Sequence, residues 1–172
     1  RDQMAELVHP IVDDPTADAL DKLQRFFATF DREKLAHKEF VLSFMRVWYA
    51  DENAIFRHKL YIARIKLFAP WLEKIIRQGV AEGIFTTPYP DQVGRMIFSL
   101  FEDLGYATAE LFLSGGPYPS DLPRGERIIE GCIDALERLL GAPTGSLRRP
   151  SREELAQWLT PLPAEKEMAH KK

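Results

Sequence analysis

The stretch that most constrains the fold of this chain is residues 52–85, which reads ENAIFRHKLYIARIKLFAPWLEKIIRQGVAEGIF. On a helical wheel, four of its charged residues fall in one narrow sector, and apolar residues spread across the opposite side. A surface helix needs an apolar stripe only about 100° wide, so this broader one requires neighbours on several sides. We therefore expect one long helix at the centre of an all-α fold.

Two residues within this stretch carry local predictions. Pro70 has no amide hydrogen for the helical ladder, and its ring clashes one turn back, so a kink or short break is expected just before it. Gly83 suits the left-handed position that ends a helix. Ile84 and Phe85 would then turn back as an apolar clasp over the helix end.

Six further segments show apolar residues at helical spacing, separated by turns containing Pro, Gly or Asp. Thr16 or Asp14 is the expected cap of the second helix. The third segment is apolar almost all round, so it should be buried. No strand pattern stands out, and the chain is expected to form a bundle of about six core helices plus a short C-terminal helix. The further helices are expected at 1–9 (ended by Pro10), about 16–31, about 33–49, 90 to about 114, about 124–140 and 151 to about 159.

The chain divides by composition into one domain, residues 1–141, and a C-terminal part, residues 142–172. The second part starts with a linker rich in Pro, Gly and Arg and ends in a polar tail. Between the linker and the tail, Ser151 and Glu154 have the spacing of a capping box, which predicts the start of the short amphipathic helix.

The two helices expected at 90–114 and 124–140 carry more apolar surface than one neighbour requires. Small residues alternate with phenylalanines on one face of the first, which permits close approach of a partner helix. We expect the chain to be a homodimer that joins through a four-helix interface. The expected interface residues are Gly94, Phe98, Gly105, Ala109, Phe112, Ile129, Ile133 and Leu140.

Composition excludes several classes of protein. The net charge is −3 and the pI about 5.9, whereas an autonomous nucleic-acid module usually has a basic face. Cys132 is the only cysteine, so neither a disulfide framework nor a cysteine zinc cluster can form. No signal peptide or apolar run long enough to span a membrane is visible, and we expect a cytoplasmic protein without a membrane partner.

The motifs of catalysis and cofactor binding are missing from the sequence. It contains no phosphate-binding glycine loop, no nucleophile elbow, and no His-x-x-x-His or Cys-x-x-Cys spacing. Its paired carboxylates are adjacent in sequence and would point apart on a helix, which disfavours an acid–base pair. We predict no catalytic site, no metal site and no cofactor.

Two arginines of the central helix, Arg57 and Arg64, fall inside its apolar sector. A buried guanidinium needs a partner or a route to water. The simpler hypothesis is an internal ion pair with Glu102 or Asp103 of the next helix. The alternative is that one arginine binds an anionic or carboxylate-bearing ligand inside the bundle. His58, at the edge of the same sector, is more simply a core or surface residue, although it could donate to such a ligand.

The run from Pro70 to Phe85, PWLEKIIRQGVAEGIF, is followed by a proline-containing turn and a new amphipathic helix. This order resembles the C-terminal regulatory domain of the TetR family of transcriptional repressors, and the helix order agrees over residues 1 to about 141. The resemblance implies dimerisation through the last two core helices. It also implies an effector pocket enclosed by the helices within 15–112. The best candidates to line that pocket, for a small hydrophobic or aromatic effector, are Phe44, Trp48, Arg57, Tyr61, Arg64, Phe68, Trp71 and Phe101.

The family's DNA-binding helix-turn-helix precedes this domain, and nothing in the present chain supplies it. Because Arg1 is not an initiator methionine, we expect upstream residues to be missing. The predicted function is therefore ligand sensing and dimerisation for a TetR-type repressor, which would contact operator DNA only through that absent N-terminal domain. The alternatives are a stand-alone helical carrier of hydrophobic ligands and a purely structural dimerisation module.

Overall fold

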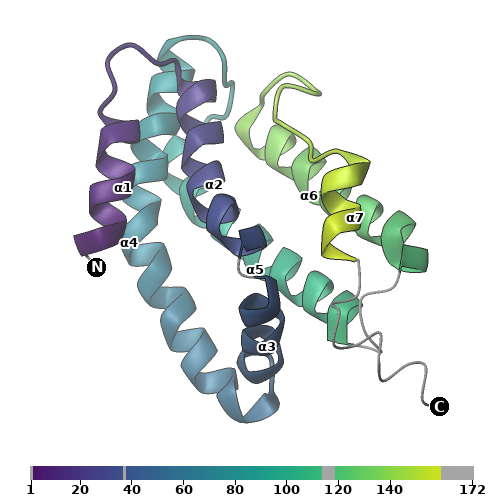
Figure 1. Cartoon of the computed structure of the whole chain (residues 1–172). Coiled ribbons are helices and arrows are strands. Elements are labelled where there is room, and N and C mark those ends of the chain that lie inside the picture. The colour runs from purple at the N-terminus through teal and green to yellow at the C-terminus, as the bar shows by residue number, and fades with distance from the viewer. Residues whose placement is uncertain (1, 37, 114–118, 160–172) are drawn as a thin grey trace, which may run out of the picture.

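The computed structural model describes residues 2–36, 38–113 and 119–159, and every regular element in those ranges is helical (Figure 1). This confirms the predicted all-α bundle with a short last helix. The elements are α1 (Asp2–Val12), α2 (Ala19–Ala36), α3 (Lys38–Trp48), a 3-10 turn (Asp51–Asn53), α4 (Ala54–Ala81), α5 (Pro90–Leu113), a 3-10 turn (Pro119–Asp121), α6 (Leu122–Leu140) and α7 (Arg152–Trp158).

Helix α4 runs the length of the bundle and contacts α1, α2 and α5, which confirms the predicted central helix (Figure 1). It passes through Pro70 without the predicted break. Pro10 likewise lies inside α1, which continues to Val12 instead of ending at the proline. In both places packing against neighbouring helices outweighs the loss of one backbone hydrogen bond.

The end of α4 has the predicted clasp. Gly83 has a φ of 73°, in the left-handed region. The backbone N–H groups of Ile84 and Phe85 both donate to the carbonyl of Gly79, at 2.9 and 3.0 Å. The ring of Phe85 is thereby buried to 1% exposure over the last turn. The chain then turns into α5.

The main core surrounds the second half of α4 and draws on α1, α2, α5 and α6. A smaller cluster of Leu111, Leu122 and Leu159 lies where α7 meets α5 and α6. Ser151 and Glu154 form the predicted capping box at the start of α7. The central residues of the main core, each less than 2% exposed, are Phe26, Phe85, Leu23, Leu72, Ile75, Ile76, Ile97, Leu140 and Val8.

Helix α3 departs from the prediction that it is buried almost all round. Leu42 is buried, but Phe40 is 70% exposed, Phe44 44% and Val47 64%. The first half of α4 is similarly exposed to solvent, with Phe56 60% exposed. The prediction was wrong because the bundle is closely packed only around the second half of α4, whereas α3 lies beside its first half (Figure 1).

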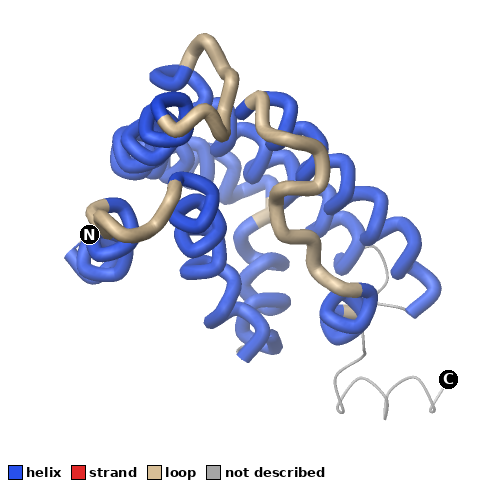
Figure 2. Tube along the Cα trace, turned by 90° about the horizontal axis from the view of Figure 1, so that it is seen from above, coloured by secondary structure: helices blue, strands red, loops and turns tan. Residues whose placement is uncertain are grey.

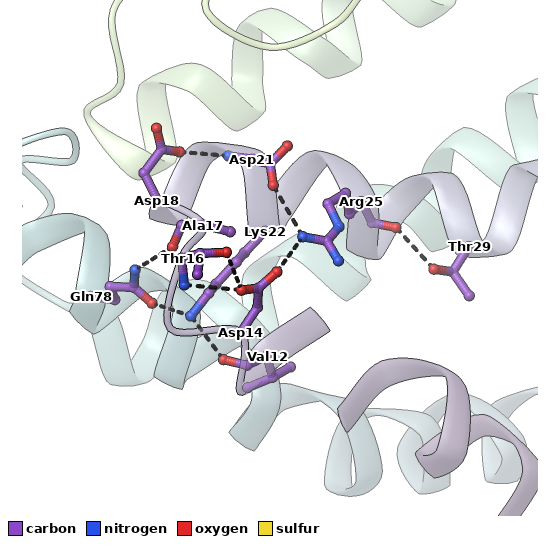
Figure 3. Close-up of polar contacts among 10 residues, drawn as sticks. All are labelled: Val12, Asp14, Thr16, Ala17, Asp18, Asp21, Lys22, Arg25, Thr29 and Gln78. Atoms are coloured by element: carbon purple, nitrogen blue, oxygen red, sulfur yellow. Dashed lines mark hydrogen bonds and ion pairs between the residues drawn. The ribbon is translucent and has the colours of Figure 1, made fainter. Parts of the chain in front are cut away.

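A polar network ties the α1–α2 connection to the second half of α4 (Figure 3). The buried amine of Lys22 donates to the carbonyl of Val12 at 3.0 Å and to the side-chain oxygen of Gln78 at 2.7 Å. The carboxylate of Asp18 accepts the backbone N–H of Asp21, so Asp18, and neither Thr16 nor Asp14, caps the start of α2.

Residues 141–151 form a long loop that turns back alongside α6 and leads into α7, as both views show (Figure 2). Leu147 of this loop is 5% exposed and belongs to the main core. The loop is therefore packed onto the bundle, although its composition is that of a linker.

Candidate functional site

The site is built around Arg57, which lies one turn into α4 and is only 6% exposed. Its Nε donates to the hydroxyl of Tyr106 at 2.7 Å. Its Nη1 donates to the carbonyl of Trp48 at 2.5 Å and, more weakly, to that of Ala50 at 3.5 Å. These bonds place the guanidinium at the point where the end of α3, the start of α4 and α5 meet.

The guanidinium of Arg57 packs against a pair of tyrosine rings. Its central carbon lies 5.4 Å from the ring centroid of Tyr49 and 5.1 Å from that of Tyr106. The two rings meet edge to face at 4.8 Å. Such contacts stabilise a cation without neutralising its charge. Burial, with the negative charge of Glu102 as the next cause, raises the pKa of Tyr49 to about 12.

A pocket of about 260 Å³ opens beside this arginine, between α4 and α5. It is half-open to the outside. Tyr61, one of the lining residues, forms a 2.8 Å hydrogen bond with Ser99 of α5. The lining residues are Ala54, Arg57, His58, Tyr61, Glu102 and Tyr106.

Arg57 has no ion pair with a carboxylate in the described part of the chain, and neither does Arg64. The predicted internal pairing of these arginines with Glu102 or Asp103 was therefore wrong. For Arg57, backbone carbonyls and a phenol take the place of the carboxylate. For Arg64, the exposed end of the side chain lies over the ring of Trp48, at 5.8 Å from its centroid.

Of the eight predicted ligand-binding residues, the structure brings Arg57 and Tyr61 to the pocket. Phe44, Trp48 and Arg64 lie outside it: the two rings belong to a row of stacked rings along α3, and Arg64 of α4 lies over Trp48. In that row Phe44 stacks on Trp48 at 5.2 Å.

The other three predicted ligand-binding residues lie in or against the main core. Phe68 is 6% exposed and meets Trp71 edge to face at 5.4 Å. Phe101 packs against Phe27 at 5.1 Å. Their side chains fill volume that the sequence left open as a possible cavity.

The residues predicted for a dimer interface all lie against other parts of the same chain. Gly94 is buried, and a side chain there would press on the backbone of α4; Gly105 faces the hydroxyl of Tyr49. A four-helix interface between two copies stays a prediction. Of the remaining six, Phe98 stacks on Phe68, Phe112 lies against Trp158, and Ile129 packs against the main core. The other three are the buried residues Ala109, Ile133 and Leu140.

Sequence reasoning missed Ala54 and Tyr106 as pocket residues, and it assigned His58 and Glu102 mainly to other roles. A usable signal was present on α5, where Ser99, Glu102 and Tyr106 recur at helical spacing within an otherwise apolar helix. A polar stripe of this kind marks a face that meets either water or a polar cavity.

In the described part of the chain, no group of three potential metal ligands comes together. Over the same residues, no helix combines the length and apolarity that a membrane span requires. The arrangement at the pocket offers charge, hydrogen-bond donors and aromatic surface, which are the means of binding a small molecule.

Residues 41–113 match the family model described as "Tetracyclin repressor-like, C-terminal domain". This range covers most of α3, all of α4 and all of α5, and so includes every residue that lines the pocket. Searches of curated proteins and of solved structures found nothing that matches the chain.

Proposed function

This chain carries a C-terminal domain of the TetR family, and on that basis we propose that it is the ligand-sensing and dimerisation part of a TetR-type transcriptional repressor. The observation that carries the proposal is the pocket beside Arg57, because it lies within the matched region and places a buried positive charge beside a half-open space of about 260 Å³. The effector would be a small aromatic or hydrophobic molecule.

The proposed mechanism is a shift between two arrangements of the helices. A ligand that binds between α4 and α5 would displace α4, to which α1 is joined through Lys22 and Gln78 (Figure 3). Helix α1 would act as the lever to N-terminal DNA-binding heads. Binding changes operator affinity only if the ligand prefers one arrangement over the other.

The first test reads the gene upstream of Arg1. We expect about 40–60 further residues with a basic helix-turn-helix pattern. A start codon within a few residues of Arg1 would contradict the repressor proposal and favour a stand-alone carrier of hydrophobic ligands.

The second test asks whether the pocket controls DNA binding in the protein with its heads. Aromatic small molecules are screened by thermal shift, and those that bind are tested for release of operator DNA by fluorescence anisotropy. Ala54→Trp fills the pocket and is expected to abolish release while leaving DNA binding intact. Ala63→Trp, exposed on the same helix outside the pocket, is the matched control and should respond as wild type. Equal release by both variants would place the effector elsewhere.

A third test measures the oligomeric state of the present chain by sedimentation. A stable dimer is expected. A monomer at all accessible concentrations would contradict the dimerisation role, whereas a dimer that binds none of the screened molecules would favour a purely structural module.

A further inference from the structure

The pocket contains two opposite charges that do not neutralise each other. Arg57 lines one part of it and Glu102 another. Within the described residues, Glu102 takes part in no hydrogen bond or ion pair, so the two groups are more than 4 Å apart. A sphere with the volume of this pocket is only about 8 Å across, so one small molecule can reach both groups.

Arg57 also retains unused hydrogen-bond donors. A guanidinium has five N–H groups, and the bonds of Arg57 engage Nε and Nη1. Nη2 has no hydrogen-bond partner in the described residues. It is also not one of the fully buried polar atoms in those residues that lack a partner. Nη2 is therefore not completely sealed, and the pocket that Arg57 lines is the open space beside this side chain.

The surroundings fix the position of the positive group and leave the negative one adaptable. Arg57 is held by two rings and the carbonyls of Trp48 and Ala50, so an acidic group would meet a preorganised donor. Glu102 is half-buried on α5. A ligand with only an acidic group would be attracted by Arg57 but repelled by Glu102. A ligand with only a cationic group would be attracted by Glu102 but repelled by Arg57.

We infer that this pocket selects a small amphoteric aromatic molecule, with its acidic group on Arg57 and a cationic or hydrogen-bond-donating group on Glu102. The aromatic body would lie between Tyr61 and Tyr106, which line the pocket from α4 and α5. The inference rests on the proposed function, because it names the chemical class of the effector for the same site.

The test compares four probes with the same ring: 4-(aminomethyl)benzoate, benzoate, benzylamine and benzyl alcohol. Their dissociation constants are measured by NMR titration of the present chain, following resonances of His58 and Tyr61 in the pocket. We expect the amphoteric probe to bind at least tenfold more tightly than each of the others.

Glu102→Gln is the decisive variant, because the Glu102 side chain makes no hydrogen bond or ion pair with the described residues that the substitution would break. The variant should bind 4-(aminomethyl)benzoate and benzylamine about tenfold more weakly than wild type, and it should bind benzoate more tightly. Asp103→Asn removes the neighbouring carboxylate of the same helix, outside the pocket, and should leave all four constants unchanged.

The outcomes separate this inference from the proposed function. If all four probes bind the pocket equally, or if Glu102→Gln leaves their order unchanged, the pocket remains a ligand site and the amphoteric selectivity is refuted. If none of the four shifts the pocket resonances, both the inference and the assignment of this pocket as the effector site are overturned.

Discussion

The guanidinium of Arg149 grips the buried carboxylate of Glu137 with two parallel hydrogen bonds: Nη1 lies 3.1 Å from Oε1, and Nη2 lies 3.1 Å from Oε2. The same carboxylate accepts the backbone N–H groups of Gly145 and Leu147, each at 3.0 Å. Glu137 is 2% exposed. A single side chain of α6 therefore holds residues 145–149 of the loop that leads to α7.

Replacing this carboxylate should destabilise the protein strongly. Glu137→Gln removes the buried carboxylate that two backbone N–H groups and Arg149 share, although Arg149 keeps its ion pair with Glu130 at 2.9 Å, and we expect the free energy of unfolding at pH 7 to fall by about 3 kcal/mol. Urea denaturation measures the change. Asp134→Asn, which removes an exposed ion pair with Arg138 on the same helix, is the control and should lower the free energy of unfolding far less. Equal losses in the two variants would contradict the prediction.

The same pair predicts a pH dependence. Arg149, together with the backbone N–H donors, lowers the pKa of Glu137 from 4.5 to about 2 in the folded state. This stabilisation is complete above the unfolded pKa of 4.5 and is lost as the pH falls from there towards 2. The stability difference between wild type and Glu137→Gln should shrink by about 2 kcal/mol between pH 7 and pH 3. A difference that stays constant over this range in urea denaturation would refute the assignment.

The clasp at the end of α4 should not tolerate a side chain at Gly79. A Cβ there would lie 2.1 Å from Cδ2 of the Phe85 ring, which is buried and cannot move aside freely. We expect Gly79→Ala to lower the free energy of unfolding by about 2 kcal/mol or more. Gly131→Ala is the matched control on α6, where an added Cβ meets nothing. It should raise stability by up to about 1 kcal/mol through helix propensity. Thermal unfolding that shows the same sign for both variants would contradict this account.

The buried amine of Lys22 should contribute to holding α1 in place. Lys22→Met leaves the carbonyl of Val12 and the amide oxygen of Gln78 without their donor, and we expect a loss of about 1–2 kcal/mol in unfolding free energy. Hydrogen exchange should also accelerate in the last turn of α1. Lys74→Met, which removes an exposed ion pair with Asp13, is the comparison and should leave that exchange close to wild type. Slower or unchanged exchange in Lys22→Met would show that the network does not restrain α1.

Local backbone signals could be predicted well from the sequence. Gly83 ends α4 in the left-handed conformation, and Ser151 with Glu154 caps α7, because both depend on interactions within a few residues. The all-α class and the central place of α4 followed from its wide apolar arc. That arc also indicated the burial of Arg57 within an apolar sector.

The partners of Arg57 and the exposure of α3 could not be predicted in the same way. Helical periodicity indicates which residues share a face, but not where the neighbouring helices stop. Phe40 and Phe44 therefore looked like core residues, although the bundle leaves them open. Likewise, the carbonyl of Trp48 became available to Arg57 only because α3 ends one short turn before α4 begins.

Pro70 divides α4 into a more exposed first half and a second half that is packed in the main core. Because proline has no N–H, the carbonyl of Lys66 lacks its partner in the helical ladder, so the rod bends there most easily. Arg57 lies thirteen residues away, about 20 Å along the axis. A bend of about 5° at the proline would therefore shift the arginine by about 2 Å relative to Gln78, the residue through which Lys22 joins α4 to α1.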